Sequence, residues 1–215
     1  MLAVKPRVAT QIPEPPVARF LFADTRMAWF WLLVRLYVGY EWFVAGWEKM
    51  TGQNLAFGSG FGTSDPATRW VFTSHAGAAI KGFATGALAK AGGAHPSVQD
   101  WYANFLKTFV IPHPGFWAYA ITFGEVAVGL GLIFGVLTGI AAFFGTVMNL
   151  NYLLSGTVST NPILGFWGIF LVLAWRIAGY YGADSYLLPL LGTPWTGTLA
   201  GKDSVPTPTR TPAAV

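Results

Sequence analysis

The sequence predicts an all-α integral membrane protein: a bundle of four transmembrane helices with a long, partly helical extracytoplasmic loop between the first and second helices. Of its 215 residues, 53% are hydrophobic and only 10% are charged, whereas soluble domains are about 25% charged. Apolar segments recur four times, each near the ~20 residues that cross a hydrocarbon core about 30 Å thick. The 26 glycines suit the close helix contacts made in lipid.

The four expected spans are Met27–Trp47, Phe116–Val136, Gly139–Leu154 and Ile163–Tyr181, of which the third is short. Together they define a membrane domain over residues 27–191. The first span has no small-residue cleavage site after it, so we expect it to be a retained anchor rather than a removed signal peptide.

Residues 51–115 are too polar and too rich in glycine to cross a membrane, so they form the expected extracytoplasmic insertion. Two pieces of it are predicted to be helical, Pro66–Ala91 and Ser97–Phe109. Ser97 is the expected N-cap of the second piece, with Asp100 in its first turn. This piece has Trp101, Phe105 and Phe109 on one side, which is typical of a helix that lies along a membrane surface.

The two ends differ in composition from the spans. Residues 1–26 hold several prolines and basic residues and are expected to be an extended cytoplasmic arm, and residues 192–215 form an irregular tail rich in proline and threonine. Four Lys or Arg lie in the short N-terminal arm and two in the C-terminal tail, against four in the long loop, and long loops count little in the positive-inside rule. We therefore expect both termini in the cytoplasm and the chain in the cytoplasmic membrane of a prokaryote.

The composition also excludes several kinds of site. There is no cysteine, so thiolate nucleophiles and iron–sulfur clusters are excluded. His75, His95 and His113 all lie in the insertion, and we expect them to be surface residues, with no haem and no metal site. The net charge of +4 is scattered, so we expect no nucleic-acid partner.

Polar residues inside the spans are the main candidates for function. With a rise of ~1.5 Å per residue, Arg35, Glu125, Asn149 and Arg176 fall in one layer, about 10 to 16 Å from the cytoplasmic edge. An unpaired charge at this depth costs at least ~2.5–3.5 kcal/mol. The sequence therefore predicts that Arg35 and Arg176 share Glu125 in a buried cluster, with Asn149 or Asn151 completing the hydrogen bonds.

Other residues of the first span are given different roles. Glu41 lies six residues after Arg35, about 120° around the helix, and is expected to line an adjoining cavity. Trp42 lies between Gly39 and Gly46 on a stripe that is typical of close helix packing. The alternative for all the buried ionisable groups is that they only fix the register of the bundle.

Several motifs resemble a known family. "RLYVGYEWFVAGWEK" resembles the first-helix signature of the DoxX superfamily, and "FGEVAVGLGLIFGVLTGIAA" resembles its second-helix pattern, although Gly139 replaces the usual basic residue after the turn. "MNLNYLLSGTVSTNP" and "AWRIAGYYGADSYLLP" are similar to the DoxD branch, the small subunit of thiosulfate:quinone oxidoreductase. The likeness covers about three quarters of the chain.

The resemblance implies a membrane subunit linked to quinone-coupled oxidation of thiosulfate or a related small donor. A quinone headgroup needs hydrogen-bond donors and a proton acceptor. On this reading Glu125 and Arg35 are the candidate catalytic residues, and quinone is the possible cofactor. The candidates for the quinone-binding or polar cluster are Arg176, Asn149, Asn151, Glu41 and Trp42.

A thiosulfate dianion needs cationic or amide donors, for which the candidates are Lys49, Asn161, Lys107 and His113. The chain shows no electron relay of its own, so electrons would pass directly or through a partner. The alternative function is a non-catalytic structural or assembly subunit that packs against a larger respiratory or photosynthetic membrane complex. Both readings expect contacts with membrane lipids and other membrane subunits.

Overall fold

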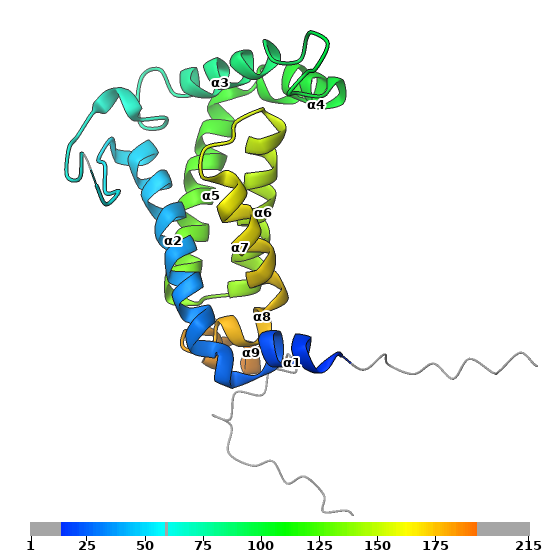
Figure 1. Ribbon diagram of the computed structural model, residues 1–215. Coiled ribbons are helices and arrows are strands. Elements are labelled where there is room, and N and C mark those ends of the chain that lie inside the picture. The colour runs from blue at the N-terminus through cyan, green and yellow to red at the C-terminus, as the bar shows by residue number, and fades with distance from the viewer. Residues whose placement is uncertain (1–13, 59, 193–215) are drawn as a thin grey trace, which may run out of the picture.

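The computed structural model describes residues 14–58 and 60–192, and this part of the chain is helical apart from its loops and one isolated bridge between Gln53 and Ser64. Four helices stand side by side as a bundle (Figure 1). They are α2 (Ala28–Thr51), α5 (Pro114–Phe134), α6 (Thr138–Leu154) and α7 (Asn161–Leu173). The expected four-helix architecture is therefore present in outline.

The outer surface that α5, α6 and α7 form is apolar. Large hydrophobic side chains on α5, α6 and α7 are half exposed or more, among them Phe134, Ile140, Phe144 and Phe166. By length and composition α5 alone, among the helices that the structure describes, could cross a membrane, since the apolar helices α6 and α7 have only 17 and 13 residues. The four separate crossings therefore stay a prediction.

Glycines bring α2 and α5 into close contact. A Cβ built at Gly39 would lie 2.9 Å from Leu132 Cβ, one at Gly46 would lie 2.8 Å from the backbone nitrogen of Val126, and one at Gly129 would lie 2.5 Å from that of Phe43. A larger residue at any of these positions would push the helices apart. The predicted packing stripe on α2 is thus confirmed, and these contacts fix which levels of the two helices face each other.

One end of the bundle, which we call the α3 end, is covered by the insertion. There α3 (Ala78–Leu88), α4 (Asp100–Phe105) and the π-helical turn η3 (Leu106–Val110) lie across the ends of the bundle helices (Figure 1) and share a second apolar core with α5. The two expected helices are shorter than predicted. The first is reduced to the 3₁₀ turn η2 (Pro66–Thr68) and α3, because the intervening residues up to Gly77 form turns.

The second expected helix begins at Asp100 with Gln99 as its N-cap, not at Ser97. The backbone amides of Ser97 and Val98 instead donate to the carbonyl of Lys90, which holds this segment in a turn after α3. Trp101 and Phe109 are 59% and 57% exposed. They lie outside the second core, as expected for rings at a membrane surface.

The opposite end, which we call the α9 end, differs most from prediction. The last part of the expected extended arm is helical: α1 (Pro16–Ala23) begins with proline at its first position, and Phe22 packs on Trp31 and Phe170. It leads through the 3₁₀ turn η1 (Thr25–Met27) into α2. Residues 1–13 and the expected tail from 193 onward lie outside the described residues.

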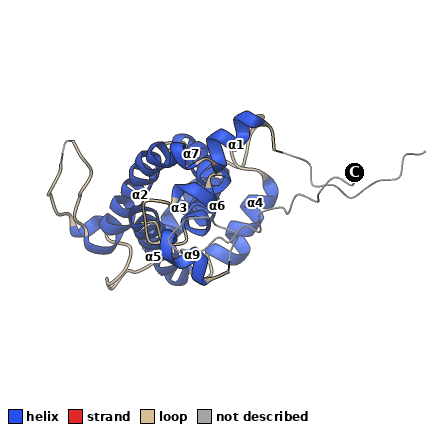
Figure 2. Ribbon diagram, turned by 90° about the horizontal axis from the view of Figure 1, so that it is seen from below, coloured by secondary structure: helices blue, strands red, loops and turns tan. Residues whose placement is uncertain are grey.

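The fourth expected span is interrupted. Helix α7 ends at Leu173, and after Ala174 the short helix α8 (Trp175–Ala178) follows, so the helix does not run on to Tyr181. A further helix that the sequence did not predict, α9 (Asp184–Leu190), closes this end, as the view along the bundle shows (Figure 2).

Candidate functional site

A buried ion pair joins α2 to α5 near the α3 end. Lys49 Nζ donates to both carboxylate oxygens of Glu125, at 2.9 and 2.7 Å. Glu125 is 1% exposed, and the side chain of Lys49 keeps 18% of its surface accessible. The buried carboxylate of Glu125 is therefore in contact with an ammonium group, that of Lys49, which reaches the surface.

Local structure explains why these two side chains meet. Lys49 is in the last turn of α2, where a cation is favoured by the helix dipole, and its Nζ lies 5.0 Å from the ring centre of Trp70. Gly46, one turn earlier, has no side chain, so the Cβ of Glu125 can approach α2 closely. A side chain at position 46 would separate Glu125 from Lys49.

Tyr152 connects this pair to α6. Its hydroxyl donates to Glu125 Oε1 at 2.6 Å. The ring stacks on Trp42, with 6.5 Å between the ring centres, and meets Phe83 edge to face at 6.1 Å. Glu125 thus accepts hydrogen bonds from a lysine on one side and a tyrosine on the other.

An aromatic pocket of about 340 Å³ adjoins Tyr152, between the insertion and the bundle. Its walls come from α3, α4, η3, α5 and α6. The polar residues that line it are Tyr102, Asn151, Tyr152 and Ser155, and the main apolar walls are Phe83, Phe105, Trp117, Ile121 and Met148. An apolar cleft with a few convergent polar groups is the usual form of a small-molecule site.

Tyr102 and Asn151 form the polar edge of this pocket. The hydroxyl of Tyr102 donates to the Asn151 backbone carbonyl at 3.0 Å and lies 3.1 Å from its Oδ1. Asn151 Nδ2 donates to the carbonyl of Val147, which leaves its second N–H free to donate to a ligand. Burial raises the pKa of Tyr102, against the opposing effect of the hydrogen bond from Ser155, so Tyr102 stays a protonated donor at neutral pH.

A second, longer groove runs between α5 and α6 and has a volume of about 760 Å³. It reaches from Phe134 and Val136 up to Trp117, and it is lined almost wholly by apolar residues. Trp117, Ile121 and Met148 line both this groove and the aromatic pocket. The two spaces therefore adjoin each other.

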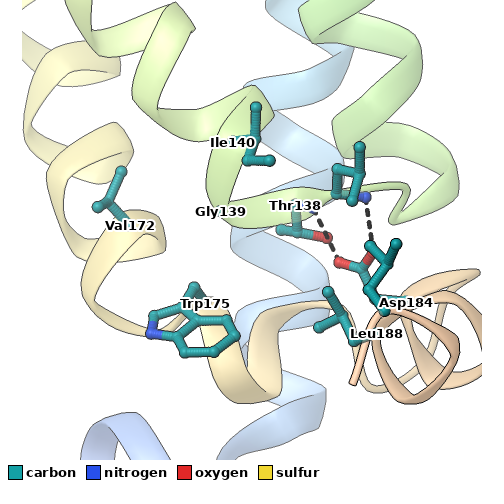
Figure 3. Close-up of a pocket in the computed structure, with 9 residues that line it drawn as sticks. Thr138, Gly139, Ile140, Val172, Trp175, Asp184 and Leu188 are labelled. Atoms are coloured by element: carbon teal, nitrogen blue, oxygen red, sulfur yellow. Dashed lines mark hydrogen bonds between the residues drawn. The ribbon is translucent and has the colours of Figure 1, made fainter. Parts of the chain in front are cut away.

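Another polar arrangement lies at the α9 end. The carboxylate of Asp184 accepts hydrogen bonds from the backbone amides of Leu137 and Thr138, at 2.6 and 2.8 Å, and so caps the start of α6 (Figure 3). A pocket of about 320 Å³ lies beside it, with Trp175 and Leu188 among its walls. Because the carboxylate is engaged by two amides and the other walls are mostly apolar, this pocket offers little for chemistry.

Arg35 belongs to this second arrangement. It is 1% exposed, its Nη2 donates to the carbonyl of Tyr181 at 3.1 Å, and its charge interacts with that of Asp184. The guanidinium packs against Gly135 and Gly182, where any side chain would collide with it. Arg35 Nε and Nη1 have no hydrogen-bond partner among the described residues.

The predicted cluster of Arg35, Arg176 and Glu125 is therefore wrong. Arg35 contacts Gly135, which caps the end of α5 ten residues after Glu125. Ten residues correspond to roughly 15 Å along a helix, so Arg35 and Glu125 lie at different levels of α5. Arg176 is half exposed, and its guanidinium bonds to Glu14 beside α1. Glu125 instead forms its ion pair with Lys49, a residue that the sequence analysis assigned to the anion-binding candidates.

The error lies in the depth of α5. The count assumed that this helix enters the membrane at Phe116, level with the ends of the other spans. In the structure the first two turns of α5 run beyond the bundle and pack against α3 and η3. Glu125 therefore lies level with Gly46 near the end of α2, rather than level with Arg35.

The remaining cluster candidates separate into two groups. Asn149 is 1% exposed, with both side-chain polar atoms unbonded in the described part of the chain, and Trp42 is buried against Tyr152. Asn151 lines the aromatic pocket. Glu41 instead lies on the outer side of α2, partly exposed.

The four anion candidates all lie toward the α3 end, but in different settings. Lys49 is bound to Glu125, Asn161 begins α7 and donates to the carbonyl of Thr157, and Lys107 and His113 are exposed around the junction of η3 and α5. The structure thus gives no compact anion cradle built from these residues, and their role stays a prediction.

Sequence reasoning missed Tyr152, Tyr102 and Asp184. Tyr152 lies within the quoted "MNLNYLL" motif, three residues after Asn149 and therefore on the same side of α6, which is a signal that could have identified it. Tyr102 comes from the insertion, and its contact with Asn151 spans 49 residues, so no local pattern indicates it.

Together these features define a class: an all-helical membrane protein whose bundle encloses a buried ion pair next to an aromatic pocket. The family model DoxX matches residues 30–156, which is more than half of the chain. The chain therefore belongs to the DoxX family, a family of membrane proteins. Searches of the curated proteins and of the solved structures found no match.

Proposed function

We propose that this chain is a DoxD-like membrane subunit that couples the oxidation of thiosulfate, or a related small donor, to the reduction of a quinone. The quinone headgroup binds in the aromatic pocket. The observation that carries this proposal is the position of Tyr152, which lines the pocket while its hydroxyl is bonded to the Glu125–Lys49 pair. A proton can thus be passed from the surface to the pocket.

Quinone reduction takes up two electrons and two protons. When two thiosulfate ions join through a new sulfur–sulfur bond to form tetrathionate, they release one electron pair, and this pair reduces the quinone ring. Lys49 passes a proton to Glu125, and Glu125 passes it to the Tyr152 oxygen as the Tyr152 hydroxyl turns its own proton from Glu125 to a quinone oxygen. Lys49 regains a proton from the surface, and two such transfers supply the two protons. General acid groups that act in this way must lie within hydrogen-bond reach of each other, and the distances of 2.6 to 2.9 Å along Lys49, Glu125 and Tyr152 meet that condition.

A neutral donor would hold the headgroup. This donor is the second N–H of Asn151, at the far edge of the pocket, where the Tyr102 hydroxyl bonds to the Asn151 carbonyl and so positions this residue. Phe83, Phe105 and Trp117 supply aromatic walls. The groove between α5 and α6 suits the isoprenoid tail, since it is apolar and meets the pocket at Trp117, Ile121 and Met148.

The donor would approach at the α3 end, where Lys49, Asn161, Lys107 and His113 lie. In the proposed orientation this end faces the outside of a prokaryotic cell, and both termini are cytoplasmic. The excess of Lys and Arg in the short N-terminal segment supports this orientation.

The test uses purified protein in lipid nanodiscs, with a short-chain quinone and thiosulfate. We expect quinone reduction, and we expect Tyr152→Phe to lower its rate at least tenfold while quinone binding, followed by tryptophan fluorescence, stays within about threefold. Tyr119→Phe is the matched control, because the hydroxyl of Tyr119 bonds to Phe72 away from the pocket. Full activity in Tyr152→Phe, or no binding of quinone to the unaltered protein, would contradict the proposal.

The second candidate function is that of a non-catalytic subunit of a larger membrane complex. It is favoured by the outer face of α2, where the carboxylates of Glu41 and Glu48 have no side-chain partner among the residues that the structure describes.

A further inference from the structure

The outer face of α2 lies at the depth of the membrane-spanning helix α5. Gly39 packs against Leu132, and Gly46 packs against Glu125, so the stretch of α2 between these glycines runs beside the interior of Pro114–Phe134. Glu41 lies within this stretch. Its carboxylate is thus at a depth where lipid would normally surround a residue on the outside of the bundle.

The side chain of Glu41 has no hydrogen bond or ion pair with any residue that the structure describes, and it is partly exposed. It interacts electrostatically with Tyr37, which lies one turn earlier and is 41% exposed. Glu48 follows seven residues later on the same side of the helix, also partly exposed and without a side-chain partner in the described part of the chain. A carboxylate that faces hydrocarbon is costly and is normally paired.

The loop after α2 adds an independent observation. It turns back along the helix, so that the hydroxyl of Tyr40 donates to the carbonyl of Leu55 at 2.7 Å and accepts from the amide of Phe57 at 2.9 Å. Phe57 stacks on Tyr40 with 5.0 Å between ring centres, yet it is 82% exposed, and Phe61 is 58% exposed. This loop stands out sideways from the bundle (Figures 1 and 2).

The loop returns toward the middle of α2. The backbones of Leu55 and Phe57 bond to the Tyr40 hydroxyl, and Tyr40 lies six residues, or about 9 Å of helix, before Gly46, the residue level with Glu125. Irregular backbone at membrane depth is tolerated where protein covers it and not where lipid does. Both the carboxylates and the loop therefore call for a covering protein.

We infer that this face of α2, formed by Tyr37, Tyr40, Glu41 and Glu48 together with the exposed rings of Phe57 and Phe61, binds a membrane-spanning helix of a different subunit that carries an arginine or lysine opposite Glu41. A second copy of this chain is a poor fit, because a twofold contact places each surface against itself and would bring the Glu41 carboxylates together. A basic helix supplies the missing charge and covers the loop.

The experiment is site-specific photo-crosslinking in native membranes, with a photoreactive amino acid in place of Tyr37. A second position, Phe143 on the apolar outer surface of α6, is the control. We expect Tyr37 to cross-link to one membrane protein, at a residue within about one turn of an Arg or Lys in a spanning helix. The Phe143 position should give mainly lipid adducts.

Charge variants then test the pairing. Glu41→Lys should lower the cross-link yield at least tenfold, and exchanging the partner's basic residue for Glu should restore it in the Glu41→Lys background. Asp100→Asn, which removes an exposed carboxylate in α4, should leave the yield unchanged. Because Glu41 has no partner in the described chain, Glu41→Gln should keep the same unfolding midpoint in detergent, which separates loss of the interface from misfolding.

Three outcomes would overturn the inference: cross-links only to lipid, cross-links to a second copy, or cross-links to residues 1–13 or 193–215 of the same chain. Equal yields for Glu41→Lys and the unaltered protein would do the same. None of these outcomes depends on quinone reduction, so the inference is tested independently of the proposed function.

Discussion

Replacement of Lys49 by methionine tests the buried ion pair most directly. Methionine keeps a long unbranched side chain but removes the charge, so Glu125 would keep one neutral donor, Tyr152, in a site where only 1% of the glutamate is exposed. Breaking a buried pair by removing one partner typically costs about 3–5 kcal/mol. The side chain of Lys49 is 18% exposed, so water already screens the pair, and we expect the lower end, about 3 kcal/mol.

The partner substitution should cost less. In Glu125→Gln, the amide can still accept from Tyr152, and Lys49 can turn toward water, so we expect about 1 kcal/mol. The double variant Lys49→Met with Glu125→Gln should then be destabilised by about 2 kcal/mol less than the sum of the two single losses, because Lys49 and Glu125 are in direct contact.

The free energies of unfolding are measured by denaturant titration in mixed micelles, with circular dichroism and tryptophan fluorescence as two probes. Lys107→Met is the matched control, because the Lys107 side chain is exposed and makes no hydrogen bond or ion pair within the described residues, and it should shift stability by at most about 0.5 kcal/mol. Single effects that add to within about 0.5 kcal/mol, or a Lys49→Met cost equal to that of Lys107→Met, would refute the ion-pair reasoning.

Three further predictions concern other parts of the chain. Gly129→Ala should destabilise the micelle-embedded protein by about 1–3 kcal/mol, because the new methyl would overlap the α2 backbone, whereas Gly82→Ala, with open space around it, should be neutral or stabilising; equal effects would contradict the close contact. Asp184→Ala and Asp184→Asn both remove the charge that interacts with Arg35, so the difference between them isolates the cap of α6: Asp184→Ala should be less stable than Asp184→Asn, whose oxygen still accepts one bond, by about 0.5–2 kcal/mol in the same unfolding assay, and equal losses would contradict the cap. Hydrogen bonds from Arg26 lower the pKa of Asp24 from 3.8 to about 2, so the stability that this carboxylate contributes is present above pH 3.8 and is lost as the pH falls toward 2; an NMR titration should show the midpoint near 2, returning toward 3.8 in Arg26→Ala.

The sequence predicted the bundle well because its signals are local. Apolar length identified the central parts of α2, α5, α6 and α7, and the spacing of Gly39 and Gly46 identified the face of α2 that packs on α5. What it missed depends on contacts across the chain. Helix α9 is anchored by Asp184, whose partners lie 46 and 47 residues earlier, and no periodicity in the helix itself records that contact.

The sequence predicted that the candidate site contains a buried ion pair, but it did not predict the correct residues of that pair. Glu125 was expected to be buried with a cationic partner, and it is, but the partner is Lys49 rather than Arg35 or Arg176. Counting residues from the start of an apolar run locates a side chain along its own helix, yet it gives no relative height for two helices of different length. The contact of Gly46 with Glu125 sets that height, and sequence spacing within either helix cannot reveal it.

The two buried polar arrangements lie at opposite ends of the bundle, and the layer between them is apolar. Lys49, Glu125 and Tyr152 gather at the α3 end, Arg35 and Asp184 at the α9 end, and Val38 and Leu132 fill the core between. A continuous path of titratable side chains from one end to the other is therefore not built into the described residues. Protons for the proposed quinone reaction would enter at the α3 end alone, where Lys49 is accessible, and they would not be drawn through the bundle from the opposite side. Under that proposal, thiosulfate oxidation releases no protons and quinone reduction consumes two, so the reaction in sealed vesicles should alkalinise only the compartment that the α3 end faces, whichever way the chain is oriented.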